Sequence, residues 1–355
     1  MPALPTTQES LELVAERAVA EQLQVVRGLL ELASTAPAAE VVTLPEPWVW
    51  TRDPTHVVAA LMGGRDPVDL TPVRRSGCTA RRRAGSRRAR ADPARTLAPM
   101  RIARFTTGDD PAYGLVDGAG EKIAEITGDP LYQRIELTGA VHDVDDVRLL
   151  APVIPRSKVI GIGRNYADHA AEMGGEAPAT PLMFLVPNTA VVGPGDPVVM
   201  PPQTREVGFE GELAVVIGRL CKDVGAQHAL GFVFGYTVAN DVTARDLQRT
   251  DGQWARAKGF DTFCPLGPWI ETDLDPAAQR IVTRVDGEVV QDGSTADMVH
   301  DTATLVAFAS AAFTLLPGDV ILTGTPAGVG LVDAGQRVEV EVDGIGVLSN
   351  PFVRH

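Results

Sequence analysis

The chain has 355 residues, of which 45% are hydrophobic, enough to build one large or two ordinary domains around a substantial core. Its formal net charge of −14 disfavours nucleic-acid binding, and its longest apolar stretch, residues 305–316, is too short to cross a bilayer. The first residues lack the basic patch, apolar core and cleavage site of a secretory signal, so we expect a cytoplasmic protein without a membrane span.

Cysteine and histidine usage narrows the kinds of metal site. Cys78, Cys221 and Cys264 are odd in number and far apart, which argues against a disulfide framework and a zinc cluster. The six histidines are scattered as well. Any bound metal is therefore expected to be a hard cation held mainly by carboxylates.

The first 99 residues differ in character from the rest. Residues 8–34 carry apolar positions at helical spacing, which predicts an amphipathic helix. Residues 74–95 contain nine arginines and one acid, Asp92, with almost no apolar residue to bury. We therefore expect a partly helical extension over 1–73 and an arginine-rich disordered linker over 74–99.

From Met100 onward the pattern is that of a β-rich protein. Alternation over 100–118 predicts a hairpin within a small β-rich subdomain, 100–150. Helices are expected only near 165–173, 225–230, 243–248 and 301–316. Strands are expected at 158–163, 190–200, 211–218, 231–241, 280–290, 318–324 and 336–348. Many strands with few helices between them favour a mainly β, α+β roll or sandwich over 151–355, rather than a βαβ fold.

Three carboxylates suggest a metal site. Glu210 and Glu212 lie two apart at the head of a predicted strand, so both point to the same face. Asp241 lies where the strand at 231–241 gives way to a helix start. Three carboxylates without histidine suit Mg²⁺ or Mn²⁺ with positions open for substrate. Two ordinary alternatives stay open: an exposed strand face for the glutamates, and a helix N-cap for Asp241.

A polar cluster directly follows the apolar run at 159–162. Tyr166, Asp168, His169 and Glu172 fall within two helical turns. His169 and Glu172 are three residues apart, so on a helix they share a face. Taken alone, this pair is more typical of an exposed helical ion pair worth a few tenths of a kcal/mol.

Five ordered motifs resemble the fumarylacetoacetate hydrolase family over about residues 100–355: GRNYADHAAEMG, FEGELAVVIG, YTVANDVTARDLQ, RAKGFDTFCPLGPWI and GDVILTGTPAGVG. The resemblance implies a β-sandwich roll of that family's C-terminal type. It also implies that Glu210, Glu212 and Asp241 ligate Mg²⁺ or Mn²⁺, and that His169 and Glu172 are a catalytic pair on a mobile lid.

The resemblance extends to the substrate-binding residues. Lys258 would donate to a substrate oxygen or carboxylate, and Gln253 would make a further polar contact. Thr325, in a glycine-rich turn that is no Walker motif, would cup the substrate carboxylate with its hydroxyl and nearby N–H groups. Arg164 and Tyr166 also match family positions at the substrate site, mainly as supports. Asn165, Arg245 and Asp246 match as supports, hinge or cap residues.

The expected activity is that of a metal-dependent hydrolase. The ion would polarise the ketone of a 2-oxo acid and stabilise the enolate released when an acylpyruvate C–C bond breaks. The alternatives are a 2-hydroxyhepta-2,4-diene-1,7-dioate isomerase or an oxaloacetate-type decarboxylase of aromatic catabolism. A different class, a non-catalytic metal- and keto-acid-binding protein, also stays open. We expect a homodimer that binds neither membrane nor, through its catalytic domain, nucleic acid.

Two explanations are left for residues 1–99. They form either a helical appendage whose basic linker contacts anionic partners, or coding sequence upstream of a native start at Met100. Because members of the family commonly begin in the manner of MRIARF, we favour the second.

Overall fold

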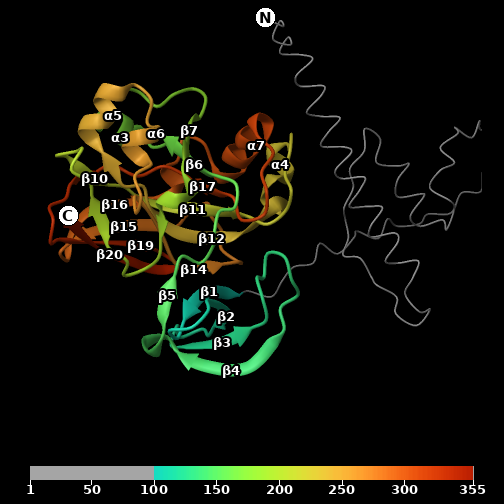
Figure 1. The fold of residues 1–355 in the computed structure, drawn as a ribbon. Helices are drawn as coiled ribbons and strands as arrows, with labels where there is room; N and C mark the ends of the chain where they lie inside the picture. Colours follow the sequence, from blue (N-terminus) through green and yellow to red (C-terminus); the bar gives the residue numbers. More distant parts are fainter. Residues whose placement is uncertain (1–99, 355) are drawn as a thin grey trace, which may run out of the picture. The chain divides into compact units, whose positions relative to one another are not determined.

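The computed structural model describes residues 100–354. The predicted helix within 8–34, the extension 1–73 and the linker 74–99 lie outside the described residues, as does Cys78. The described chain is mainly strands with a few short helices, arranged in three sheets (Figure 1). The predicted mainly β, α+β fold class is therefore confirmed.

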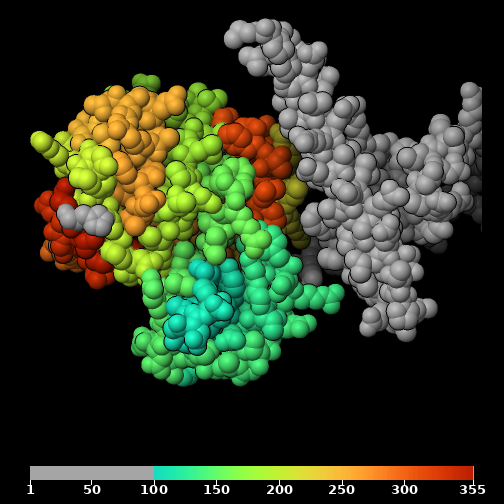
Figure 2. All heavy atoms as spheres, in the orientation of Figure 1, coloured from blue at the N-terminus to red at the C-terminus, as the bar shows by residue number. Residues whose placement is uncertain are grey.

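The first five strands build a small antiparallel lobe. They are β1 (Arg101–Thr106), β2 (Ala112–Val116), β3 (Lys122–Ile126), β4 (Leu137–Asp143) and β5 (Arg148–Leu150). β1 and β2 form the predicted hairpin, and Ala103, Phe105 and Ile123 fill the lobe's core. Figure 2 shows these residues, in cyan and green, gathered below the others in the described part of the chain.

The lobe continues into a 12-stranded sheet because β1 also pairs with β14 (Cys264–Glu271). The order along the sheet is β4-β3-β2-β1-β14-β12-β11-β17-β6-β7. Its further members are β6 (Val159–Gly163), β7 (Leu182–Val186), β8 (Val191–Val192), β11 (Gly211–Ile217), β12 (Val233–Asn240) and β17 (Val320–Leu322). β17 and β6 run parallel while β11 pairs antiparallel with both neighbours, so the sheet is mixed.

Two smaller sheets complete the fold. One has the order β16 (Glu288–Ser294), β15 (Arg280–Val285), β19 (Arg337–Val342), β20 (Gly346–Arg354) and β9 (Val198–Met200). The other has the order β13 (Thr243–Ala244), β10 (Val207–Phe209) and β18 (Gly330–Leu331). The strand expected over 190–200 is split into β8 and β9, because the intervening GPGDP segment turns the chain.

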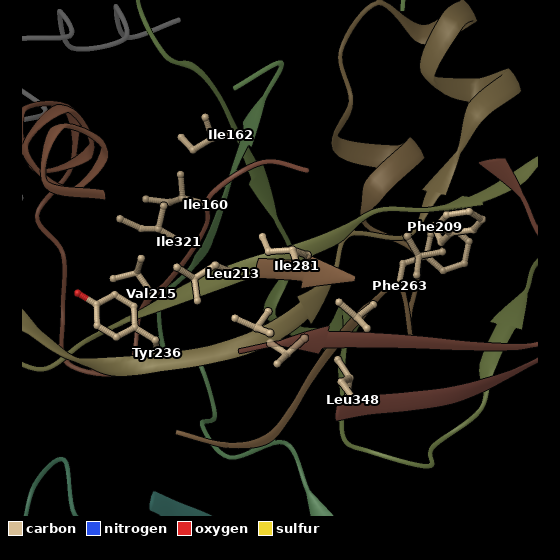
Figure 3. Close-up of a cluster of buried hydrophobic side chains, with 14 of the residues drawn as sticks. Ile160, Ile162, Phe209, Leu213, Val215, Tyr236, Phe263, Ile281, Ile321 and Leu348 are labelled. Atoms are coloured by element: carbon tan, nitrogen blue, oxygen red, sulfur yellow. The ribbon is translucent and has the colours of Figure 1, made fainter. Parts of the chain in front are cut away.

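The main core lies between the large sheet and the five-stranded sheet. Leu213 and Val215 of β11 meet Ile281 of β15 and Leu348 of β20 in one apolar cluster (Figure 3). Ala214 and Val216 face the opposite side and join a second cluster. Since side chains alternate along a strand, Glu212 also points to this second side, away from the sandwich core.

The helices are short. They are α3 (Ala167–Glu172), α4 (Ala226–Ala229), α5 (Arg245–Asp251), α6 (Ala255–Lys258) and α7 (Thr302–Ala312). The Asp301 side chain caps α7 by accepting from the Thr304 N–H. The helix expected to reach Leu316 ends at Ala312, since Leu315 pairs with Cys221 instead. None of the helices between residues 100 and 354 is long and apolar enough to span a membrane.

Candidate metal centre

Three buried carboxylates meet around the start of β11. Glu210 lies between β10 and β11, Glu212 is the second residue of β11, and Asp241 follows the last residue of β12. Gly211 pairs with Asn240, and the Asp241 N–H donates to the Glu210 carbonyl at 2.9 Å. One carboxylate oxygen of each acid lies within 4.8 Å of the others. All three acids are at most 5% exposed, so the alternative of an exposed strand face is wrong.

Lys258 is the positive partner that bridges two of these acids. Its Nζ donates to Glu210 Oε2 at 2.7 Å and to Asp241 Oδ2 at 2.6 Å, and its side chain is 2% exposed. It lies on α6, which the sequence pattern did not predict.

Because α5 begins at Arg245 and its cap residue is Ala244, the helix-cap interpretation of Asp241 is also wrong.

Arg245 supplies the second positive charge. Its Nη1 donates to Glu210 Oε1 at 2.6 Å and to Gln248 Oε1 at 3.1 Å. The guanidinium is buried, and its stem packs where any side chain at Gly208 would stand, since a Cβ there would lie 2.8 Å from Arg245 Nε. Glu210 is thus the acid held by two cations.

The pKa values of the three acids differ because their neighbours differ. Burial disfavours the charged form of each. For Glu210, the charges of Lys258 and Arg245 outweigh burial and lower the pKa to about 2. For Asp241, burial prevails over the single contact to Lys258 and raises the pKa to about 6. Burial, followed by the charges of Asp241 and Glu210, raises the pKa of Glu212 well above its usual value.

These acids fit a divalent cation. Asp241 Oδ1 is buried and has no hydrogen-bond partner within residues 100–354. A polar atom so placed costs free energy unless a cation or a proton satisfies it. Three carboxylate donors without histidine or thiolate suit Mg²⁺ or Mn²⁺, and positive charge would relieve the repulsion felt by Glu212. Glu210, Glu212 and Asp241 are therefore the residues that would hold the ion.

The histidine and glutamate predicted as a pair lie together on α3, which follows β6. His169 Nδ1 is 3.3 Å from Glu172 Oε2, and His169 is 5% exposed. Glu172 Oε2 also accepts from the Gly328 N–H at 3.2 Å. The charge of His169 is one of the smaller causes that lower the pKa of Glu210, so the imidazole lies within electrostatic range of that acid.

The glycine-rich turn after β17 contacts Glu212 and the helix α3. The Gly324 N–H donates to Glu212 Oε2 at 2.8 Å, and the Gly328 N–H donates to Glu172. Both glycines have left-handed backbones, with φ of +96° and +99°, a region that side chains rarely adopt. One turn therefore connects a predicted metal ligand with the predicted catalytic pair.

Thr325 uses its hydroxyl within the protein. The hydroxyl donates to the Gly211 carbonyl at 2.8 Å and accepts from Gln291 Nε2 at 2.8 Å. Gln291 also donates to the Pro326 carbonyl and accepts from the Gly211 N–H at 3.0 Å. The buried amide of Gln291, which no sequence motif indicated, thus joins β11 to the turn. That substrate binds at Thr325 stays a prediction. The contact would then be made by the N–H groups around Thr325.

The remaining predicted site residues differ in their placement. Arg164 lies at the junction of β6 and α3 with φ 56°. The buried Tyr166 hydroxyl has no partner in the described chain, and burial, then the charge of Glu212, raises its pKa. Gln253 is exposed between α5 and α6, whereas Gln248 contacts Arg245. The structure thus places Gln248, which sequence reasoning missed, against Arg245 and leaves Gln253 at the surface.

Two of the predicted supports make the hydrogen bonds expected of such residues. Asn165 Nδ2 donates to the Thr323 carbonyl at 2.8 Å, which fixes the start of the lid against the glycine-rich turn. The Asp246 carboxylate accepts from the Arg205 N–H at 3.1 Å and from the Thr204 hydroxyl. The two contacts of Asp246 hold α5 against the segment before β10.

Comparison with known proteins places the chain in a family. The sequence model described as fumarylacetoacetate (FAA) hydrolase C-terminal matches residues 158–353, and one described as Rv2993c-like, N-terminal matches residues 100–152. The fold and the buried acids agree with that match. The chain therefore belongs to the fumarylacetoacetate hydrolase family, whose enzymes typically depend on a divalent metal.

Individual relatives carry different activity names. Protein Rv2993c of Mycobacterium tuberculosis is 51% identical over 262 residues, covering 72% of this chain and 98% of that protein. A crystal structure titled 5-carboxymethyl-2-hydroxymuconate delta-isomerase, from Mycobacterium smegmatis, is 51% identical with a TM-score of 0.67 and covers 72% and 100%. The mitochondrial oxaloacetate tautomerase Fahd2a of Rattus norvegicus is 38% identical over 294 residues, covering 74% and 94%.

Proposed function

We propose that this protein is a divalent-cation-dependent enzyme that interconverts the keto and enol forms of a 2-oxo acid, as an isomerase or tautomerase. The observation that carries the proposal is the turn at 324–328, whose N–H groups bind Glu212 on one side and Glu172 on the other. The turn thus links the helix that carries His169 and Glu172 to one of the three acids, which supports treating the pair and the acids as one site. The names of the isomerase and tautomerase relatives support the same reaction class.

The chemistry needs a way to acidify the carbon beside the ketone. A divalent ion held by Glu210, Glu212 and Asp241 would polarise the ketone of a bound 2-oxo acid. Lys258 lies against two of these acids and 5.3 Å from the centre of the Phe184 ring, so its charge acts in a dry environment. In this proposal Lys258 also donates to a substrate oxygen.

His169 is the proton carrier in this proposal. Glu172 accepts the Nδ1 proton, which leaves Nε2 as the basic nitrogen and stabilises the imidazolium that forms. Nε2 takes a proton from the carbon next to the ketone, and a proton is returned either to the former ketone oxygen, which gives the enol, or to a conjugated carbon, which gives an isomer. One C–H bond breaks and another bond to hydrogen forms, so no oxidant or second substrate is required.

Hydrolysis of an acylpyruvate is the second candidate. The same His169–Glu172 pair would then draw a proton from water that attacks the acyl carbonyl, and the C–C bond would break with the enol of a 2-oxo acid as leaving group. The contact between the buried His169 and Glu172 favours this candidate over decarboxylation, because hydrolysis needs a base to activate water and decarboxylation needs none. Isomerisation comes first because one proton carrier is sufficient for it.

An ultraviolet assay of enol absorbance separates the candidates. Protein loaded with Mg²⁺ or Mn²⁺ is given oxaloacetate, a hydroxymuconate-type diacid or an acylpyruvate. We expect metal-dependent loss or gain of the enol signal without C–C cleavage, and we expect His169→Ala to abolish it while metal binding persists. Asp168→Ala, an exposed neighbour on the same helix, is the control. Metal binding without turnover of any compound would instead indicate a non-catalytic binding protein.

A further inference from the structure

Both ends of the lid converge on one residue. The lid is defined as residues 165–181, which contain α3 and the loop leading to β7. His300 lies between the 3₁₀ turn Thr295–Asp297 and the start of α7, far from the lid in sequence. Its main chain contacts the first residue of the lid, and its imidazole contacts the loop after α3.

The first of these contacts joins the side-chain amide of Asn165 to the main chain of His300, and we call it the joint. Asn165 Nδ2 donates to the His300 carbonyl at 3.0 Å, and the His300 N–H donates to Asn165 Oδ1 at 2.9 Å. The neighbouring Val299 N–H donates to the Asn165 carbonyl at 2.8 Å. Any residue at position 300 would supply these main-chain groups. The joint fixes where the lid begins and does not require histidine.

The second contact does require a side chain of this shape. The His300 Nε2–H donates to the Pro178 carbonyl at 3.0 Å from a half-buried ring. Among residues 100–354, this is the one hydrogen bond that ties residues 176–181 to the rest of the chain. Pro178 and Pro181 have no N–H to donate, so the loop has few other ways to be fixed. The imidazole therefore determines where the lid ends.

We propose that His300 is a positioning residue that closes the lid over the metal centre by clamping residue 178 to the joint at residue 165. The proposal rests on the proposed function, because it assigns the clamp the task of placing His169 and Glu172. His169 lies between the two clamped residues in the sequence, and the contact between Glu172 and Gly328 holds the same helix, so the clamp and this contact together restrain the position of His169. Opening is then the step that admits substrate.

Hydrogen–deuterium exchange tests the clamp without relying on turnover. His300→Phe keeps an aromatic ring and loses the donor, and His300→Asn stays polar but ends short of Pro178. We expect both to speed exchange in peptides covering 165–181 by about five- to tenfold, the effect of losing one net hydrogen bond. His300→Gln, whose Nε2 reaches as far as the imidazole Nε2, should restore protection. His228→Phe, at an exposed position on α4, is the control.

Kinetics supply the second readout. In His300→Phe we expect kcat/KM to fall by the same factor as lid protection, with Mn²⁺ affinity and the unfolding midpoint unchanged, and His300→Gln should recover it. Unchanged lid exchange in both His300→Phe and His300→Asn would overturn the clamp, as would failure of His300→Gln to protect. A wild-type protein with a protected lid but no turnover would overturn the proposed function and leave the clamp standing.

Discussion

At the scale of single residues, the contacts of Lys258 explain why three acids can be buried together. Its ammonium bridges Glu210 and Asp241, and Arg245 neutralises the other side of Glu210. Glu212 has no such cation and is held by an N–H group of Gly324. The three acids are therefore unequal in the metal-free protein, with Glu210 charged and Glu212 inclined to keep a proton.

Removing the ammonium should destabilise the metal-free protein. We expect Lys258→Met to lower the free energy of unfolding by roughly 3–5 kcal/mol in chelator, because breaking a buried ion pair leaves its partners uncompensated. Saturating Mn²⁺ should recover part of the loss by binding the folded state. Urea unfolding with and without Mn²⁺ measures both. Lys122→Met, which removes an exposed pair with Asp143, should change nothing, and an equal loss in both variants would contradict the account.

The raised pKa of Asp241 should make metal binding pH-dependent. With a pKa of about 6, Asp241 is mostly protonated at pH 5 and mostly ionised at pH 7.5. Because a metal ligand must lose its proton, we expect Mn²⁺ affinity to be about tenfold weaker at pH 5 than at pH 7.5 from this group alone. Glu212 adds to the trend in the same direction. Calorimetric titration with Mn²⁺ at pH 5 and pH 7.5 measures the two affinities. Equal affinities would contradict the assignment of Asp241 as a metal ligand with a raised pKa.

The raised pKa of Asp241 also determines how this group changes the stability of the protein with pH. The folded state keeps the Asp241 proton up to a pKa of about 6, whereas the ordinary value is 3.8. Between these values the folded state binds more protons than the unfolded state, so this group lowers stability as pH rises. Glu210 acts oppositely, since its pKa is depressed to about 2 and its contribution is lost as pH falls below 4.5.

At the scale of elements, the start of β11 depends on having no side chain at Gly211. A Cβ there would lie 2.1 Å from Thr283 Oγ1 and 2.9 Å from Val340 Cγ1 of the five-stranded sheet. Gly211 also gives its N–H to Gln291 and its carbonyl to Thr325. The two sheets can therefore approach closely between Glu210 and Glu212, which fixes both acids.

A methyl group at this position should disturb the site. We expect Gly211→Ala to cost about 1–3 kcal/mol of stability through overpacking and to weaken Mn²⁺ binding, because β11 must shift with both glutamates. Gly231→Ala, where nothing lies within 4 Å of the added Cβ, is the matched control. Thermal unfolding and calorimetry provide the two measurements. Wild-type Mn²⁺ affinity in Gly211→Ala would show that β11 does not position the acids.

How far the sequence predicts this site depends on the range of each contact. Strand periodicity predicts that Glu210 and Glu212 share a face, and helix periodicity predicts the same of His169 and Glu172, because both act over a few residues. The catalytic role of His169 and Glu172 came from the family resemblance. The short α6 has too few residues to show a period, so it could not be predicted. Gln291 and His300 act through contacts 34 to 135 residues away, and no local pattern encodes those.

The assignment of Gln253 shows a related limit. The resemblance assigned a substrate contact to Gln253, yet the structure leaves that residue exposed and brings Gln248 to Arg245. The link between α5 and α6 turns at Gly252, with φ 71°, and residue spacing does not show where side chains point beyond such a turn. Substrate binding by Gln253 stays a prediction.

At the scale of the whole molecule, every residue of the described site lies within one β-sandwich. The acids, the lid and the glycine-rich turn come from residues 165–328, and β1 joins the small lobe to the same large sheet. We therefore expect a chain beginning at Met100 to bind Mn²⁺ as tightly as the full chain. Calorimetry on both forms measures this, and a large loss of affinity in the shorter chain would contradict it. The homodimer stays a prediction, which a measurement of the molar mass in solution by light scattering would test.

The central claim is that one divalent cation binds between Glu210, Glu212 and Asp241. Calorimetric titration of chelator-stripped protein with Mn²⁺ tests it most directly, in wild type and in a variant carrying Glu210→Gln, Glu212→Gln and Asp241→Asn. The account predicts one ion per wild-type chain and none in the variant. No uptake by wild type, or equal uptake by the variant, would contradict it.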